Sequence, residues 1–455
     1  KSFDFFETFS FQPHDLQKEF LAFFNVHATS HGGTFVLRAP MGVGKTEAAL
    51  SAAAFDRMKG SKGIFFGLPT TLTSDRIFIR MEEFLSKIDK EYLSLRRLHG
   101  KAHFYTEQPD QNPSGFSAAD WFGRSLKKGM IAPYGVGTVD QALLGVLPAK
   151  HFFLRLFTLA GKTVIFDEVH SYDAYTGSLL KMLIEYLVEL RCNVIIISAT
   201  LTSSWLEKMF NISQVDDFYP SVHYFDKGKQ FGIPLPGKPG NCVEIELKTL
   251  NESSTDVFIQ KVLELASSTG ANILWVCNTV DEAQRIFLRV KGTNTEDGPK
   301  IALLHSRYLQ KDRRSVEELW MDRLGKNGER FLKGTILIGT QVVEQSLDID
   351  VDYMITELAP MDFLLQRAGR LWRHTKLRPL STPKMVITTK SSSSTIFSLT
   401  SAKQIRKKLG PSANVYCPYI LLRTLSTLQN RSLLTLPNEI QKLIESTYRE
   451  REEDL

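Results

Sequence analysis

The sequence is poor in cysteine and contains no long apolar run. Its 455 residues include four cysteines, which lie far apart and form no C-x-x-C pair. This spacing suggests neither a zinc ribbon nor a disulfide framework, and reduced thiols in a cytoplasmic protein are the simplest account. No stretch approaches the roughly 20 apolar residues of a membrane span, and no signal peptide is visible. We therefore expect no membrane partner.

Biased composition is also absent. Glycine (29 residues) and proline (18 residues) occur at ordinary frequencies, which excludes a collagen-like or low-complexity chain. Hydrophobic residues make up 43% and charged residues 23% of the chain, the balance of a folded globular protein rather than a disordered one. The net charge of +6 fits a polyanionic partner but does not require one.

Short apolar runs alternate with helix-period stretches along most of the chain, which predicts an α/β fold with parallel sheets covered by helices. The expected strands include residues 34–37, 63–66, 163–166, 194–197, 273–276, 301–304, 335–338 and 353–356. A segment rich in proline and glycine, at about 211–241, interrupts the alternation and is interpreted as an irregular linker. The prediction is one α/β domain at 1–222, a second at 223–395 and a helical extension or partial C-terminal domain at 396–455.

A phosphate-binding loop is predicted at residues 39–46, because the segment Ala-Pro-Met-Gly-Val-Gly-Lys-Thr follows an expected strand and opens an expected helix. Gly42 and Gly44 allow backbone N–H groups to turn toward a β-phosphate. Lys45 places a cation against the β- and γ-phosphates, and Thr46 offers a hydroxyl to Mg²⁺. The helix N-terminus adds its partial positive charge. A chance glycine-rich turn is the less favoured alternative.

An acidic box at residues 167–170, Asp-Glu-Val-His, ends another expected strand. Carboxylates in this position lie where α/β sheets bind their ligands. We expect Asp167 to hold Mg²⁺ through water and Glu168 to orient and deprotonate the attacking water. Alone, the tetrapeptide would be read as a solvated acidic turn. Its place after a phosphate loop and before Ser198-Ala199-Thr200 favours the catalytic interpretation.

The order of these motifs, ending in residues 366–370 (Gln-Arg-Ala-Gly-Arg), resembles superfamily 2 helicases. A narrower similarity is to the helicase of type I CRISPR systems, the Cas-three family. It rests on residues 68–74, 137–143, 150–151, 159–162, 171–173, 304–308 and 339–348. The resemblance covers about residues 11–375 and implies two tandem RecA-like domains.

The resemblance also implies roles for individual residues. Gln17 matches the glutamine that reads the adenine edge, and Met41, Val43, Glu47 and Asp348 match further nucleotide-binding positions. Arg370 and Arg373 match arginine fingers that act on the γ-phosphate from the second domain. Gln366 belongs to the same motif, and Arg367 is expected to pair with the acidic box or with phosphate. Trp372 departs from the glycine of many helicases. Ser198 and Thr200 are expected to couple the nucleotide site to the nucleic-acid site.

A further group of residues matches positions near the nucleic-acid track of such helicases. Each of them also has an ordinary reading as a turn residue at a strand end, so the group carries more weight than any member. The group consists of Pro69, Thr70, Thr71, Thr138, Asp140, Gln141, Asn278, Thr279, His305, Ser306, Thr340 and Gln341.

The function implied by the resemblance is an ATP- and Mg²⁺-dependent translocase on single-stranded DNA, acting in CRISPR interference. Its expected partners are an RNA-guided target-recognition complex of the Cascade type and a nuclease of the His-Asp (HD) class. A housekeeping DNA or RNA helicase, or a nucleotide-gated subunit that recruits a nuclease without moving, remain alternatives. His14-Asp15 lies inside the adenine-reading motif without further ligands at metal spacing. His27 and His31 lie in a polar turn. We therefore expect the nuclease on a part outside this sequence or on a separate chain.

Overall fold

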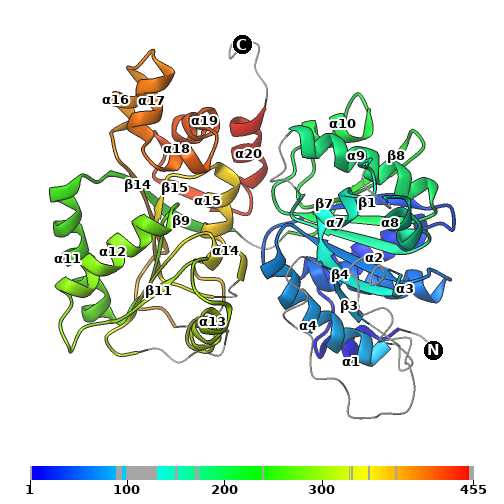
Figure 1. Ribbon diagram of the computed structural model, residues 1–455, viewed down its shortest axis with the longest axis horizontal. Helices are drawn as coiled ribbons and strands as arrows, with labels where there is room; N and C mark the ends of the chain where they lie inside the picture. Colours follow the sequence, from blue (N-terminus) through cyan, green and yellow to red (C-terminus); the bar gives the residue numbers. More distant parts are fainter. Residues whose placement is uncertain are drawn as a thin grey trace. The chain divides into compact units, whose positions relative to one another are not determined.

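The computed structural model describes residues 3–88, 95–98, 131–148, 152–169, 174–237, 240–326, 328, 331–346, 349–374 and 377–449 (Figure 1). The chain divides into two compact units, Lys1–Lys238 and Pro239–Leu455. Each unit contains one mostly parallel sheet, so the predicted α/β class with two sheet domains is confirmed. No helix in the described ranges is long and apolar enough to cross a membrane.

The sheet of unit 1 has eight strands among the described residues. Their order is β3 (Leu95–Leu98), β4 (Tyr134–Thr138), β2 (Ile64–Leu68), β5 (Thr163–Asp167), β6 (Asn193–Ser198), β1 (Gly33–Arg38), β7 (Ser221–Asp226) and β8 (Lys229–Pro234). The first six are parallel, and β7 and β8 are antiparallel additions beside β1. The central strands β1 and β6 are buried at every position, as expected for apolar runs covered on both faces.

Helices cover both faces of this first sheet. One face packs against α1 (Phe5–Phe9), α2 (Asp15–His27), α3 (Lys45–Met58) and α4 (Thr71–Ile88). The other face packs against α7 (Val139–Leu143), α8 (Phe152–Leu159), α9 (Ala174–Glu189) and α10 (Ser203–Phe210).

The sheet of unit 2 has seven strands among the described residues. Their order is β11 (Lys300–Leu304), β12 (Thr335–Gly339), β10 (Asn272–Val276), β13 (Tyr353–Glu357), β14 (Lys384–Thr389), β9 (Asn241–Thr249) and β15 (Leu433–Leu436). All are parallel except β15, which pairs antiparallel with β9. One face is covered by α11 (Glu252–Thr269) and α12 (Val280–Thr293). The remaining helices are α13 (Gln310–Leu324), α14 (Val342–Ser346), α15 (Met361–Ala368), α16 (Ser393–Phe397), α17 (Ala402–Leu409), α18 (Ser412–Val415), α19 (Pro418–Leu428) and α20 (Ile440–Tyr448).

Two expectations about organisation differ from the structure. The interpretation of 211–241 as an irregular linker was wrong, because it contains the β7–β8 hairpin; hydrogen bonding of β7 to β1 moves the division between units from 222 to Lys238. The described part of the predicted extension, residues 396–449, is helical for the most part, but β15 completes the second sheet. That segment is therefore part of unit 2 rather than a separate extension.

Candidate active site and nucleic-acid surface

The predicted phosphate loop connects the end of β1 to the start of α3. Gly42 and Gly44 adopt φ values of +74° and +77°, which L side chains rarely adopt. A Cβ on Gly44 would lie 2.3 Å from Gln17 Nε2, so only glycine fits there. The buried Lys45 ammonium donates to the carbonyl oxygens of Ala39 (2.8 Å) and Pro40 (3.1 Å). These bonds hold the cation against the loop, where the first turn of the 14-residue helix α3 supplies further backbone donors.

Gln17 lies directly behind this loop and is fully buried. Its Nε2 donates to the carbonyl of Gly44 (3.0 Å), and its Oε1 accepts from the backbone N–H of His14 (2.9 Å). The side chain therefore ties the start of α2 to the phosphate loop. Next along the loop, the Glu47 carboxylate forms an ion pair with Arg80 of α4. Met41 and Thr46 are half-buried, and Val43 is buried.

Strand β6, which ends at Ser198, lies between two other strands of the sheet. One neighbour is β1, which leads into the phosphate loop, and the other is β5, which leads into the acidic box. The backbone N–H of Glu168 donates to Ile197 O (3.0 Å), and that of Ala39 donates to Ser198 O (3.1 Å). The Ser198 hydroxyl donates to Glu168 Oε2 (3.3 Å) and accepts from the Thr200 backbone N–H (3.2 Å). These bonds join the phosphate loop, the acidic box and the Ser198–Thr200 segment at one edge of the sheet.

Two features of this edge are unusual for a merely structural turn. Glu168 has φ +52°, a left-handed conformation that is uncommon outside glycine and gathers at functional sites. The Thr200 hydroxyl is buried and has no hydrogen-bond partner among the described residues.

Tyr219 lies near the same edge. Burial raises the pKa of Tyr219, with the Glu168 charge acting in the same direction, and the Tyr219 hydroxyl donates to Ala199 O (3.0 Å). Asp167 is half-buried at the end of β5. His170, Asp348, residues 150–151 and residues 171–173 lie outside the described residues.

The nucleic-acid candidates of unit 1 continue along the same carboxyl edge. Pro69 and Thr70 follow β2, and Thr138 ends the neighbouring β4, opposite Leu68 in register. Thr70 O accepts from both the backbone N–H and the hydroxyl of Ser74, which starts α4 firmly at Thr71. Asp140 is exposed on α7. Arg155 Nη1 donates to the backbone oxygen and the Oε1 of Gln141, and burial lowers the pKa of Arg155.

In unit 2, the motif residues meet in a closed, buried network. Arg367 is fully buried; its Nε donates to Glu344 Oε1 (2.7 Å), and its terminal nitrogens contact Thr356, Asn278 and Tyr416. Gln341 Nε2 donates to Asn278 O (3.1 Å) and to Tyr416 Oη (3.0 Å). Asn278 Nδ2 donates to Leu358 O and Ser412 Oγ, both at 2.8 Å.

This network corrects two expectations. Arg367 pairs with Glu344 of its own unit rather than with the acidic box or a phosphate, because its guanidinium is enclosed between α14, β13 and α18. Asn278 is only 3% exposed, with both amide protons used inside the unit. Its role in the structure is to hold β10 to the segment after β13. Glu344 and Tyr416 were missed as site residues; Glu344 lies inside a quoted motif, whereas no pattern pointed to Tyr416.

The other candidates of unit 2 lie at strand ends around this network. Thr279 caps α12 by accepting the Glu282 N–H, and the buried Thr340 follows β12. His305 is buried, and its Nδ1 accepts the backbone N–H of Arg307 (3.2 Å); burial lowers the pKa of this ring. Ser306 beside it is exposed.

The predicted arginine fingers follow α15. Arg370 is half-buried, and its Nη2 donates to Glu344 O (2.5 Å); the Arg373 backbone N–H donates to Asp350 Oδ1 (2.9 Å). Gln366 is half-buried on α15. Trp372 has φ +50°, the conformation that glycine adopts easily, which explains in physical terms why many helicases carry glycine there. The Arg378 guanidinium lies 5.4 Å from the Trp372 ring centroid, a cation–π contact that a glycine would lack.

Comparisons with known proteins agree with this geometry. Residues 22–209 match the DEAD/DEAH box helicase family, the class that the two parallel sheets, phosphate loop and acidic box define. Residues 269–376 match the family described as CRISPR-associated nuclease/helicase Cas3, C-terminal. The chain is similar in sequence and fold to the Cas3 family of CRISPR-associated helicases.

Individual relatives support this assignment over different shares of their length. The chain is 32% identical to the CRISPR-associated endonuclease/helicase Cas3 of Thermus thermophilus over 91% of this chain and 50% of the relative. For the Escherichia coli protein of the same description, the identity is 34% over 76% of this chain and 41% of the relative. The crystal structure of T. fusca Cas3-ATP is similar with a TM-score of 0.85 and 31% identity, over 99% of this chain and 54% of that one. The chain thus spans about half the length of the curated relatives it matches.

Proposed function

We propose that this chain hydrolyses ATP and uses the energy to move along single-stranded DNA. The observation that carries the proposal is the junction at the carboxyl edge of unit 1, where Ser198 bonds to Glu168 and its strand bonds to the first residue of the phosphate loop. A change in the nucleotide's phosphates would reach the nucleic-acid candidates along the same edge through these strand ends. A solved relative described as Cas3-ATP supports ATP as the nucleotide.

The residues of unit 1 have distinct tasks in this proposal. The backbone donors of the loop and of α3 bind the phosphates, and Lys45 exchanges its two carbonyl acceptors for phosphate oxygens. Glu168, oriented by the Ser198 hydroxyl, accepts the proton of the attacking water. Thr46 and Asp167 offer the hard oxygen ligands that fit Mg²⁺, which neutralises phosphate charge when bound.

We further propose that the DNA is a target of CRISPR interference and that strand separation serves a nuclease. Relatives over 30% identical are described as endonuclease/helicase Cas3, and a similar solved chain (30% identity, TM-score 0.72) belongs to a CRISPR RNA-guided surveillance complex. This chain matches about half of such proteins, and in its described residues no three histidine, cysteine or acidic side chains gather into a metal site. A nuclease domain outside this sequence, or a separate chain, would therefore cut the strand, recruited by an RNA-guided complex.

The test is ATP turnover with and without single-stranded DNA, in wild type and in Lys45→Ala. We expect DNA to stimulate turnover and the variant to lose at least about tenfold, since removing one electrostatic stabiliser commonly costs about 10²–10³. Lys59→Ala, at the exposed far end of α3, is the matched control and should retain turnover. Near-normal turnover in Lys45→Ala would contradict the proposal. Stronger stimulation by RNA than by DNA would favour a housekeeping RNA helicase instead.

A further inference from the structure

The positive charge of the chain is concentrated in one long segment. Between Asp362 and Glu439 the sequence contains no acidic residue at all, although the whole chain carries 50 aspartates and glutamates. The same segment contains 13 of the 56 lysines and arginines. The net charge of the whole chain is only +6, so this segment is a basic region inside a chain whose remaining residues are acidic on balance.

Five of these 13 cations form ion pairs inside unit 2. The ion pairs are Arg367 with Glu344, Arg378 with Asp350 and Asp352, Lys384 with Glu246, Lys390 with Glu282, and Arg431 with Glu439. By contrast, Lys403, Arg406, Lys407 and Lys408 form no ion pair among the described residues. All four lie on α17.

Three of these four cations share one exposed face of α17. Lys403, Arg406 and Lys407 are spaced at i, i+3 and i+4, which places them side by side on a helix. All three are exposed, whereas Leu409 at the C-terminal end of the helix is buried. The helices that pack against α17, namely α16, α18 and α19, contain no acidic residue. The local field of this face is therefore positive without compensation.

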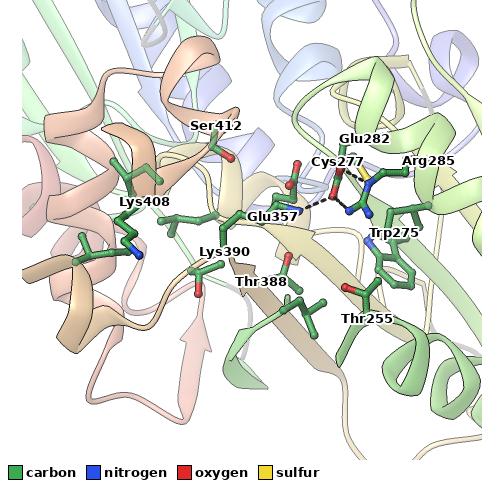
Figure 2. A pocket seen from close by; sticks show the side chains of 16 residues that line it. Thr255, Trp275, Cys277, Glu282, Arg285, Glu357, Thr388, Lys390, Lys408 and Ser412 are labelled. Atoms are coloured by element: carbon green, nitrogen blue, oxygen red, sulfur yellow. Dashed lines mark hydrogen bonds and ion pairs between the residues drawn. The ribbon is translucent and has the colours of Figure 1, made fainter. Parts of the chain in front are cut away.

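The fourth cation belongs to a different environment. Figure 2 shows a cleft at the carboxyl ends of β10, β13 and β14, lined by Lys408 together with Lys390, Arg285, Glu282 and Glu357. Glu282 is bonded to Arg285 (2.8 Å) and Lys390 (2.7 Å), as the dashed lines mark. Lys408 lines this cleft and does not belong to the face formed by the other three cations.

The cleft also fixes where α17 lies. Leu409 and Ser412 line it beside Thr388 at the end of β14, and Ser412 accepts a hydrogen bond from Asn278 at the end of β10. The helix therefore lies at the carboxyl edge of the second sheet. That is the edge where Thr279, His305 and Thr340 follow their strands. The exposed cations extend this edge on its β14 side.

We propose that the Lys403–Arg406–Lys407 face of α17 binds the phosphate backbone of single-stranded DNA. The inference rests on the proposed function, which supplies the polyanion. Three exposed, unpaired cations on one helix suit phosphates and read no base edges, so the contact is independent of sequence. It extends the DNA-binding surface beyond the motif residues, several of which are engaged inside unit 2.

The test is the salt dependence of binding to a labelled oligothymidine. Each phosphate contact on a single strand contributes a slope of about −0.7 in log K against log salt. Lys403→Gln combined with Arg406→Gln and Lys407→Gln should weaken binding at low salt and reduce the magnitude of the slope by about 2. A charge-preserving set, Lys403→Arg with Arg406→Lys and Lys407→Arg, should retain the wild-type slope.

A second triple variant controls for net charge. Lys261→Gln, Lys291→Gln and Lys300→Gln remove the same charge from exposed positions on α11, the end of α12 and the start of β11. Its slope should stay close to that of wild type, and all variants should keep the wild-type melting temperature. Equal slopes for the two glutamine triples would overturn the proposal.

Two further outcomes separate the proposal from the function on which it rests. If wild type binds the oligothymidine and the α17 triple binds it equally well but loses affinity for polyglutamate, the face serves an acidic protein. The α17 proposal then fails while the motor proposal stands. If wild type itself fails to bind the oligothymidine, both fail.

Discussion

The carboxyl edges of the two sheets have the same architecture but use their polar residues in opposite ways. In unit 1, the Lys45 ammonium donates to two carbonyls of its own loop, and Ser198 bridges to Glu168 at the rim of the sheet. In unit 2, Arg367 is fully buried, paired with Glu344, and surrounded by further hydrogen bonds. The first edge presents groups that can exchange partners, whereas the second keeps its central groups permanently engaged.

This difference shows that a motif at a strand end does not by itself define a ligand site. Both edges carry charged residues from helicase motifs. Only the burial of a side chain and its hydrogen bonds distinguish a group that can bind a ligand from a structural one. In unit 2, the residues able to meet a ligand are those just outside the network, such as Arg370 and the α17 cations. Substitutions outside that boundary should therefore change turnover, whereas substitutions inside it should change stability.

The largest effect is expected at Arg370, which follows the helix that carries Arg367. Arg370→Ala should leave ATP affinity largely intact, because Lys45 and the loop remain. Turnover should fall by about 10³–10⁵, as for loss of an arginine finger. Arg370→Lys should retain only part of the wild-type turnover, since an ammonium cannot reproduce the forked guanidinium contact. Affinity and turnover are measured on the same preparations; no change in either would show that unit 2 contributes nothing to the chemistry.

Arg367 should instead act on stability. Arg367→Met leaves the buried Glu344 without its cation and should cost about 3–5 kcal/mol in the free energy of unfolding. Adding Glu344→Leu should restore part of the loss, because the uncompensated charge is removed. Arg289→Met is the control: its partners Glu252 and Asp256 are 84% and 65% exposed, so about 1 kcal/mol or less is expected. The free energy of unfolding of each variant is measured by denaturant titration. If Arg367→Met lost as little stability as the control, the closed network would be contradicted.

A smaller contrast concerns how the stability of each unit depends on pH. Burial, reinforced by the adjacent Arg38 charge, lowers the pKa of His223 in unit 1 to about 3 from its ordinary 6.5. Stability that depends on the neutral ring is complete above pH 6.5 and is lost as the pH falls toward 3, because the unfolded chain binds the proton first. In unit 2, burial opposes ionisation of Glu282, but hydrogen bonds from Arg285 and Lys390 lower its pKa to about 2 from 4.5. Its contribution is retained down to pH 4.5 and is lost below it.

Unit 1 should therefore lose about 2 kcal/mol between pH 6.5 and pH 5 through His223. Hydrogen exchange resolved by peptide reports the two units separately. His223→Gln should remove most of this loss, whereas His31→Gln, in an exposed turn of the same unit, should not. An unchanged pH profile in His223→Gln would assign the acid response of unit 1 to other groups.

The sequence predicted the strands that are apolar on both faces: seven of the eight named runs fall within strands of the sheets, and the run 63–66 begins one residue before β2. The same criterion missed strands outside the buried centre. β9 is exposed at its first two residues and at its last, and buried residues alternate with half-buried ones in between; β7 lies in a proline-rich stretch. These strands are specified by the partners they meet, β1 and β14, rather than by their own composition.

The candidate site shows the same limit at the level of side chains. Spacing and context predicted the phosphate loop and the acidic box because their chemistry depends on local chain geometry. The burial of Arg367 and the contribution of Tyr416 depend on a segment some 50 residues further along the chain folding back over the motif. No local pattern encodes that return, so the sequence correctly identified the motif but not which of its arginines is enclosed.

The pairing of β15 with β9 has a consequence for the order in which the chain can fold. Every described strand of the first sheet lies before residue 235, so unit 1 can form its sheet while the rest is still being synthesised. The second sheet joins residues 241–249 to residues 433–436, and cannot be complete until almost the entire unit has been made. Closing so long a loop is slow and leaves β9 with an unpaired edge in the interval. During synthesis, the first unit can therefore be complete while the second is still unfinished, and a chaperone would act on the second unit.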